Sequence, residues 1–296
     1  MPTQDNTVEL VAPMNCQVGE NPLWHPEAAK LFFVDILAGT VFAYTPANKT
    51  CRVFCQTRIT GGFTLQEDGS LLLFQDGRVA ILSMDGTLRE VMSGLCPHNA
   101  RFNDVIADPE GRVYAGAMNG NGRLMRFDPD GTVTELFDGV GIPNGMGFTP
   151  DLAGMYFTDS AARQIYKFDY DRKTGNLSKR RIFTEISPAE GLPDGMTVDA
   201  EGYVWTAVWF GGRVMRFAPD GRLDGEVFFP AYQTSAVTFG GPELTDIFVT
   251  SAAAPPDEKL RPRALDLAAH RGGGLYHVRV EGMRGGPQFR SRLRFP

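Results

Sequence analysis

Short runs rich in Val, Phe, Tyr, Leu and Thr recur along the whole chain, and long amphipathic helical patterns are absent. Turn signals separate these runs, which is typical of antiparallel β-structure. Asp-Gly pairs suit tight hairpin turns, so the pattern predicts strands joined as meandering hairpins. The pairs are Asp68-Gly69, Asp76-Gly77, Asp85-Gly86, Asp130-Gly131, Asp138-Gly139 and Asp220-Gly221.

The chain also aligns with itself. ENPLWHPEAAKLFFVD (residues 20–35) lies over NGMGFTPDLAGMYFTD (residues 144–159) without a gap, and further copies begin at four other places. The copies recur at intervals of 41, 42, 41, 50 and 41 residues. Six multi-strand copies at this period predict an all-β fold, a six-bladed β-propeller that forms one domain over residues 1–296. The equivalent positions are Glu20, Gly61, Asn103, Asn144, Asp194 and Ser235.

Five segments lie outside the regular repeat. The polar stretch 169–181 fills the long interval and predicts an extended hairpin that projects from the fourth repeat. Closure is expected between TVELV near the N-terminus and GGLYHVRV (residues 273–280), because that pairing would remove an exposed edge. The segment Ala252–Arg271 has the composition of a loop and a short helix over the channel mouth, and the basic run 284–294 predicts a short solvated tail.

In a propeller the innermost strands line the central channel, so the six equivalent positions converge on the axis. A purely structural repeat would carry similar small residues there, yet this set has two carboxylates and two carboxamides. Glu20, Asn144 and Asp194 offer hard oxygen ligands for one divalent metal: calcium first, with magnesium, manganese, zinc or ferrous iron also possible. The alternative is that each belongs to an ordinary turn, as in Asn144-Gly145. The shared phase favours the metal.

The third copy begins with Arg101 and Asn103, a guanidinium beside a carboxamide. This pair is suited to hold substrate hydroxyls or a developing oxyanion, and the alternative is a salt bridge from Arg101 to a neighbouring acid. Asp104 is expected to face away from Asn103 in an extended strand and to have a structural or supporting role. Because Gly61 has no side chain and Ser235 has a small one, one sector of the channel is expected to stay open for a ligand.

Composition narrows the function classes. The chain is 43% hydrophobic and 22% charged with a net charge of −6, which argues for a soluble protein without a nucleic-acid partner. No stretch approaches the roughly 18 apolar residues of a membrane span, and the start lacks a secretory signal, so a cytoplasmic location is expected. The four cysteines and four histidines show no metal-ligand spacing, so any metal binds through oxygen. Nothing in the sequence indicates the oligomeric state.

The chain resembles the gluconolactonase and regucalcin family of the senescence-marker-protein type, which includes luciferin-regenerating enzymes. The resemblance implies a propeller with one divalent metal on Glu20, Asn144 and Asp194, and substrate contacts from Arg101 and Asn103. It also implies hydrolysis of a sugar lactone such as gluconolactone or a pentonolactone. The matching segments are GENPLWHPEAAKLFFVDI, RFNDVIADPEGRVYAGAM, IPNGMGFTPDLAGMYFTDS, FDYDRKTGNLSKRRIF and LPDGMTVDAEGYVWTAVWFGGRVMRFAPDG.

The expected mechanism has the metal polarise the lactone carbonyl while Asp194 orients water or accepts its proton. One departure concerns the stretch after Met118, where many relatives carry a longer segment, sometimes with an acidic substrate-binding residue. Two other functions stay open. One is a non-catalytic calcium-binding regulatory protein, and the other is a metal-dependent hydrolase of other esters or phosphotriesters, because a fold does not determine a function.

Overall fold

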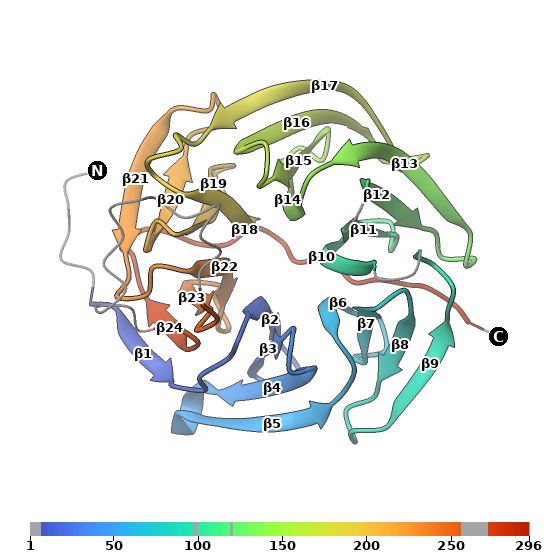
Figure 1. Ribbon diagram of the computed structural model, residues 1–296, viewed down its shortest axis with the longest axis horizontal. Helices are drawn as coiled ribbons and strands as arrows, with labels where there is room; N and C mark the ends of the chain where they lie inside the picture. The colour runs from blue at the N-terminus through green and yellow to red at the C-terminus, as the bar shows by residue number, and fades with distance from the viewer. Residues whose placement is uncertain (1–6, 97–99, 119–120, 256–271, 296) are drawn as a thin grey trace.

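The computed structural model describes residues 7–96, 100–118, 121–255 and 272–295. Within these residues the chain forms strands β1 to β24 and one short 3-10 helix, Pro46–Asn48. The strands make six four-stranded antiparallel sheets, which stand as blades around a central axis (Figure 1). The all-β, six-bladed propeller predicted from the sequence is therefore confirmed.

Five blades are simple meanders in which successive strands lie farther from the axis. Blade 1 contains β2 (Gly19–His25), β3 (Lys30–Asp35), β4 (Thr40–Thr45) and β5 (Thr50–Gln56). Blade 2 contains β6 (Thr60–Leu65), β7 (Leu71–Gln75), β8 (Val79–Leu82) and β9 (Leu88–Met92). Blade 3 contains β10 (Arg101–Ala107), β11 (Val113–Met118), β12 (Gly122–Phe127) and β13 (Val133–Val140). Blade 4 contains β14 (Pro143–Phe148), β15 (Gly154–Asp159), β16 (Gln164–Asp171) and β17 (Asn176–Glu185). Blade 5 contains β18 (Leu192–Val198), β19 (Val204–Trp209), β20 (Arg213–Phe217) and β21 (Leu223–Phe228).

Blade 6 closes the ring and combines both ends of the chain. Its inner strands are β22 (Thr234–Gly240), β23 (Asp246–Ser251) and β24 (Leu275–Val278), and its outer strand is β1 (Glu9–Ala12). Glu9 pairs with His277 in an antiparallel ladder, as the sequence predicted. The inner strands of neighbouring blades contact one another in order, and β22 contacts β2 to complete the circle.

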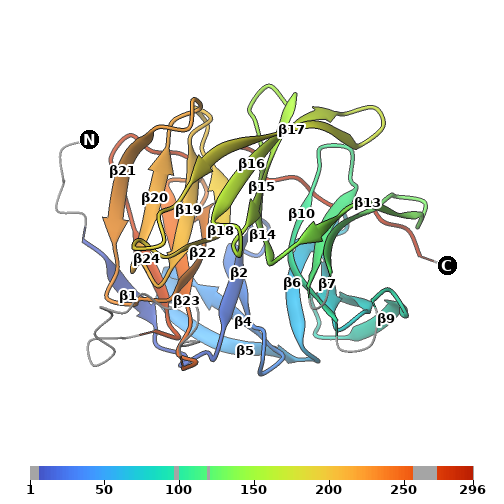
Figure 2. The same ribbon diagram turned by 45° about the horizontal axis from the view of Figure 1, so that its top comes forward.

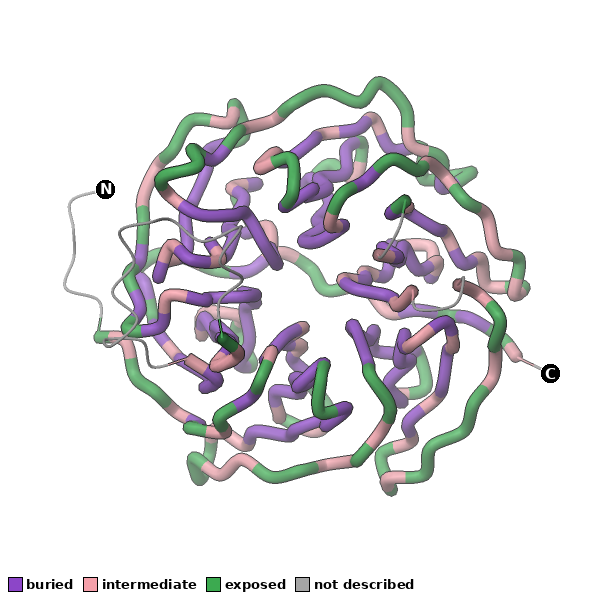
Figure 3. The backbone as a smooth tube through the Cα atoms, in the orientation of Figure 1, coloured by how far each residue is buried: buried purple, intermediate pink, exposed green. Residues whose placement is uncertain are grey.

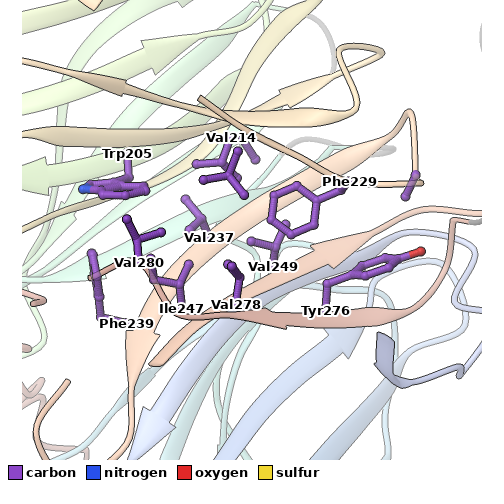
Figure 4. Packing of buried hydrophobic residues seen from close by; sticks show 13 residues of the cluster. Trp205, Val214, Phe229, Val237, Phe239, Ile247, Val249, Tyr276, Val278 and Val280 are labelled. Atoms are coloured by element: carbon purple, nitrogen blue, oxygen red, sulfur yellow. The ribbon is translucent and has the colours of Figure 1, made fainter. Parts of the chain in front are cut away.

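Apolar side chains from facing blades form the core. In the described residues, each of the six interfaces between blades has one hydrophobic cluster. Figure 4 shows the cluster between blades 5 and 6, where Trp205 and Val214 face Phe239 and Val249. Burial falls from the axis to the rim, so β15 is buried throughout while β17 is mostly exposed (Figure 3).

Five of the six Asp-Gly pairs form hairpin turns, with glycine at positive φ. The prediction of a turn at Asp138-Gly139 is wrong, because this pair lies inside β13. The ladder to β12 skips Gly139, which has φ 75° and donates its N–H to Asn121 Oδ1 at 3.1 Å. The glycine therefore forms a β-bulge, which needs the same backbone freedom as a turn.

The hairpin of β16 and β17 extends from blade 4, as the sequence predicted, and its tip lies against blade 3 (Figure 2). The Tyr114 hydroxyl donates to Gly175 O at 2.6 Å, and Arg112 Nη1 donates to Arg172 O at 3.0 Å. The Tyr170 hydroxyl donates to the buried Asp108 carboxylate at 2.7 Å. Polar residues in this segment thus bind a neighbouring blade. Composition alone does not show whether a polar segment makes such contacts or faces solvent.

The basic C-terminal run is not a solvated tail, so that prediction is also wrong. We call the face where the inner strands begin the upper face and the face where they end the lower face. Residues 281–295 cross the lower face (Figure 1), where Gly285 pairs with Asp199 and Ser291 with Gln66. Ser291 and Leu293 are buried while the alternating arginines are more exposed, so the run is amphipathic with period two.

The segment predicted to cover the channel mouth lies mostly outside the described residues, since 256–271 are not described. No helix among the described residues is long and apolar enough to cross a membrane.

Candidate functional site

All six innermost strands carry a register shift at the same level of the channel. Such a bulge adds one residue, bends the strand and redirects its side chains, and bulges are common beside functional sites. The equivalent positions of the sequence repeat lie at these bulges. The shifts fall between Glu20 and Leu23, Thr60 and Gly62, Phe102 and Val105, Asn144 and Met146, Pro193 and Met196, and Thr234 and Val237.

Two carboxylates of this ring are buried, Glu20 at 6% exposure and Asp194 at 5%. Glu20 Oε2 accepts the backbone N–H of Asn21 at 2.9 Å, while Asp194 Oδ1 has no hydrogen-bond partner among the described residues. Burial raises the pKa of both groups well above the usual range. Neighbouring negative charges raise both pKa values further: that of Asp104 acts on Glu20, and those of Glu20 and Asp104 act on Asp194. Two carboxylates are therefore buried in the ring, and one of their oxygens has no hydrogen-bond partner among the described residues.

Hydrogen bonds fix the orientation of the Asn144 carboxamide. Its Nδ2 donates to Ser160 Oγ at 3.0 Å, and that hydroxyl donates to Pro193 O at 2.6 Å. Its Oδ1 accepts from Asn103 Nδ2 at 3.1 Å. A carbonyl oxygen has two lone pairs, so Asn144 Oδ1 has one left for a further partner.

Arg101 and Asn103 lie at the same level. Arg101 Nη1 donates to Asn103 Oδ1 at 2.7 Å and to Phe102 O at 2.9 Å, and Asn103 Nδ2 also donates to Pro143 O at 2.8 Å. No carboxylate in the described part of the chain lies within salt-bridge distance of Arg101. Burial lowers the pKa of Arg101, and the charges of Glu20 and Asp194 oppose that shift.

Gly61 and Ser235, where an open sector was expected, both lie against a neighbouring blade. A Cβ added to Gly61 would lie 2.1 Å from Phe102 O, so the backbone of β10 fills the space that a side chain would take. The Ser235 hydroxyl donates to Gly19 O at 2.5 Å and lies 2.9 Å from Thr250 Oγ1. Both residues thus serve the packing of one blade against the next.

A cavity of about 210 Å³ lies on the lower side of the ring. Glu20, Asn144 and Asp194 are not among the residues that line it. Phe289 from the C-terminal run lines its lower end. Asp104 is also one of the residues that line the cavity, and it lies at the bulge between Phe102 and Val105 in β10.

Glu20, Asn144 and Asp194 suit a divalent cation by their chemistry. The donors are all oxygens, one buried carboxylate oxygen has no partner, and the described residues supply no ion pair to either carboxylate. No group of three His, Cys, Asp or Glu side chains in the described residues forms a metal cluster, so a cation here needs the Asn144 carboxamide as a donor.

The family profile described as SMP-30/Gluconolactonase/LRE-like region matches residues 18–253. Pentonolactonase XacC of Haloferax volcanii is 42% identical over 292 residues, which cover 97% of this chain and 99% of that protein. A luciferin-regenerating enzyme has a structure with TM-score 0.89 at 29% identity, covering 97% of this chain and 100% of the other. A regucalcin from Agrobacterium tumefaciens, described as a calcium-binding protein, has TM-score 0.84 at 25% identity, covering 98% of each chain. The profile match over most of the chain and the similarity along its whole length agree with the six-bladed fold, and this chain belongs to the SMP-30/gluconolactonase/LRE-like family.

Proposed function

We propose that this protein hydrolyses a sugar lactone, such as gluconolactone or a pentonolactone, to the aldonic acid with the help of one divalent cation. The observation that carries the proposal is the buried Asp194 Oδ1, which has no hydrogen-bond partner among the described residues. Asp194 lies on the axial ring, where the negative charge of Glu20 raises its pKa. The pentonolactonase relative supports the substrate class, because its similarity extends over 97% of this chain.

Glu20, Asn144 and Asp194 would hold the cation. A bound divalent cation polarises a carbonyl and stabilises the oxyanion that forms when water adds to it. Calcium is our first choice because the donors are all hard oxygens and because one relative is described as calcium-binding. Zinc, manganese, magnesium and ferrous iron also bind carboxylate and carboxamide oxygens and are the alternatives to calcium.

In the reaction, the oxygen of water bonds to the lactone carbonyl carbon, and the bond from that carbon to the ring oxygen breaks. Asp194 orients the water and accepts its proton, which ends on the former ring oxygen as a hydroxyl. Arg101 binds ring hydroxyls or the oxyanion through its remaining N–H groups. Asn103 holds the guanidinium by a 2.7 Å hydrogen bond and can accept a ring hydroxyl at Oδ1, because its two amide hydrogens go to Pro143 O and Asn144 Oδ1. Burial of the ring limits competition from bulk water.

The test is the rate of lactone opening, measured above the spontaneous rate, for the Asp194→Ala variant. Removal of the carboxylate should lower kcat/KM at least roughly 100-fold. Asp130→Ala is the matched control, because that aspartate lies in an exposed turn. Unchanged cation-dependent turnover in Asp194→Ala would overturn the assignment. A panel of gluconolactone, pentonolactones, an aryl ester and a phosphotriester, run with each divalent ion restored to stripped protein, identifies substrate and metal.

A non-catalytic calcium-binding role is the second candidate, because the Agrobacterium relative is described only as a calcium-binding protein. Chelation separates the two functions. Both predict a loss of thermal stability when the cation is removed, but only the enzyme predicts cation-dependent turnover of a lactone.

A further inference from the structure

A second ring of residues lies one position after the six equivalent positions of the repeat, with one residue on each inner strand. Four of its members are Gly or Ala, and space is short: a Cβ on Gly145 would lie 2.5 Å from Asp194 O. Asp104 is the only ionisable residue of this ring, and it is one of the residues that line the cavity below the candidate ligands. The ring consists of Asn21, Gly62, Asp104, Gly145, Gly195 and Ala236.

No hydrogen bond from the described residues reaches the Asp104 carboxylate, and burial alone shifts its pKa. Its charge nevertheless acts on both Glu20 and Asp194. The described groups around the axis are thus three carboxylates and one guanidinium, that of Arg101, with a formal sum of −2. One divalent cation makes this sum zero, whereas a monovalent cation leaves it negative.

We propose that Asp104 is a positioning residue for the cation of the proposed function. Its carboxylate supplies the third negative charge, so that the formal charge of the site is −2 and a divalent ion neutralises it. It raises the affinity of the Glu20, Asn144 and Asp194 set without being one of that set. The cost of this arrangement is like-charge repulsion between the half-buried Asp104 and the buried Glu20 and Asp194 when no cation is bound.

The proposal makes two predictions of opposite sign for one variant, Asp104→Asn in the full-length chain. Calcium affinity, measured by calorimetric titration of stripped protein, should fall roughly ten- to a hundredfold because one nearby charge is lost. The melting temperature in excess EDTA should rise by about 2–4 °C because repulsion is relieved. A purely structural Asp104 predicts a lower melting temperature instead. Glu110→Gln is the control, since that carboxylate is only partly buried and pairs with Arg172 on the rim.

Asn21→Asp provides a charge-swap test. Asn21 occupies the equivalent position of blade 1, lines the same cavity, and accepts the Phe63 N–H through Oδ1 at 2.6 Å, which an aspartate retains. The double variant Asp104→Asn with Asn21→Asp should recover most of the lost calcium affinity. Asn21→Asp alone should bind calcium more tightly and melt lower in EDTA, which tests the proposal even if Asp104→Asn fails to fold.

The outcomes separate this inference from the proposed function on which it rests. Equal calcium affinity of wild type and Asp104→Asn, with lactone turnover intact, overturns the role of Asp104 alone. A lower EDTA melting temperature for Asp104→Asn also overturns it. If the wild-type protein binds no divalent cation, both the cation of the proposed function and the role of Asp104 are wrong.

Discussion

Three carboxylates with raised pKa values lie around the axis, and the proposed chemistry depends on them. Burial raises the pKa of Asp104 to about 7, and burial together with like charges raises those of Glu20 and Asp194 well above their usual range. Among the described residues, Arg101 supplies the opposing charge near Asp194. The metal-free site is therefore less favourable at any pH where all three groups are ionised.

This arrangement predicts the pH dependence of stability. Between the unfolded pKa of Asp104, near 3.8, and the folded value of about 7, the folded state keeps a proton that the unfolded state has released. Raising the pH through this window therefore lowers the free energy of unfolding of the metal-free protein. We expect the melting temperature in EDTA to fall on the order of 5 °C from about pH 5 to about pH 8.

Calcium is the control for that prediction. A bound cation neutralises the carboxylates, so the downward trend should disappear when calcium replaces EDTA. A melting temperature that stays constant or rises with pH in EDTA would contradict the assignment of raised pKa values to the axial carboxylates.

The positions of these residues were predictable, but their partners were not. The common phase of Glu20, Asn144 and Asp194 follows from aligning the repeats, because each repeat is one blade. The link from Arg101 through Asn103 to Asn144 needs the geometry of two adjacent blades. The sequence predicted a structural or supporting role for Asp104 but not its place at a bulge in β10, because the sequence of a single strand does not show a bulge.

At the scale of elements, glycine sets how closely the inner strands approach. Gly145 has no positive φ, yet its Cα lies against the backbone of β18. Gly225 also lacks a positive φ, but it lies in the outer strand β21, and a Cβ there would meet nothing within 4 Å. A Cβ would therefore meet backbone atoms at Gly145, which lies at a bulge, and nothing at Gly225.

Replacing each with alanine isolates the effect of close approach. Gly145→Ala should lower the free energy of unfolding by at least about 2 kcal/mol, because a Cβ would lie 2.5 Å from Asp194 O and a backbone oxygen has little freedom to move. Because that oxygen belongs to a candidate ligand, lactone turnover should fall as well. Gly225→Ala should be nearly neutral in chemical denaturation, and equal losses for both variants would contradict this view of the inner ring.

Element prediction succeeded where a pattern repeats and failed where a residue type has two uses. Asp138-Gly139 has the composition of a hairpin turn and instead forms a bulge, because positive φ serves both structures. Gly61 looked like a gap in the channel wall, yet the backbone at Phe102 fills it. Both errors concern neighbouring strands, whose positions a linear pattern does not specify.

At the scale of the whole molecule, the C-terminal run holds several blades together across the lower face. The Ser291 hydroxyl lies 2.8 Å from Thr64 Oγ1 in blade 2, and Arg294 N donates to Pro129 O in blade 3 at 3.0 Å. Leu293 belongs to the cluster between these two blades. The run looked like a solvated tail because its arginines dominate the composition, whereas its small and apolar residues alternate with them.

Leu293→Ala distinguishes these descriptions. Truncation of this buried side chain should cost about 2–4 kcal/mol of unfolding free energy in chemical denaturation. Arg294→Ala, at the exposed neighbouring position, should change it by less than about 0.5 kcal/mol. A solvated tail predicts no effect from either substitution.

The pairing of β1 with β24 has a consequence for synthesis on the ribosome. Contacts between residues far apart in the sequence form slowly. The contact of Thr64 with Ser291 at the lower face, which joins residues 227 positions apart, is of the same kind. Of the described strands, β1 is translated first and its partner β24 last. The backbone N–H and C=O groups of β1 that pair with β24 therefore stay unpaired while five blades are translated. Slow refolding and a demand for chaperones during expression are the expected cost of closing a ring with its own first strand.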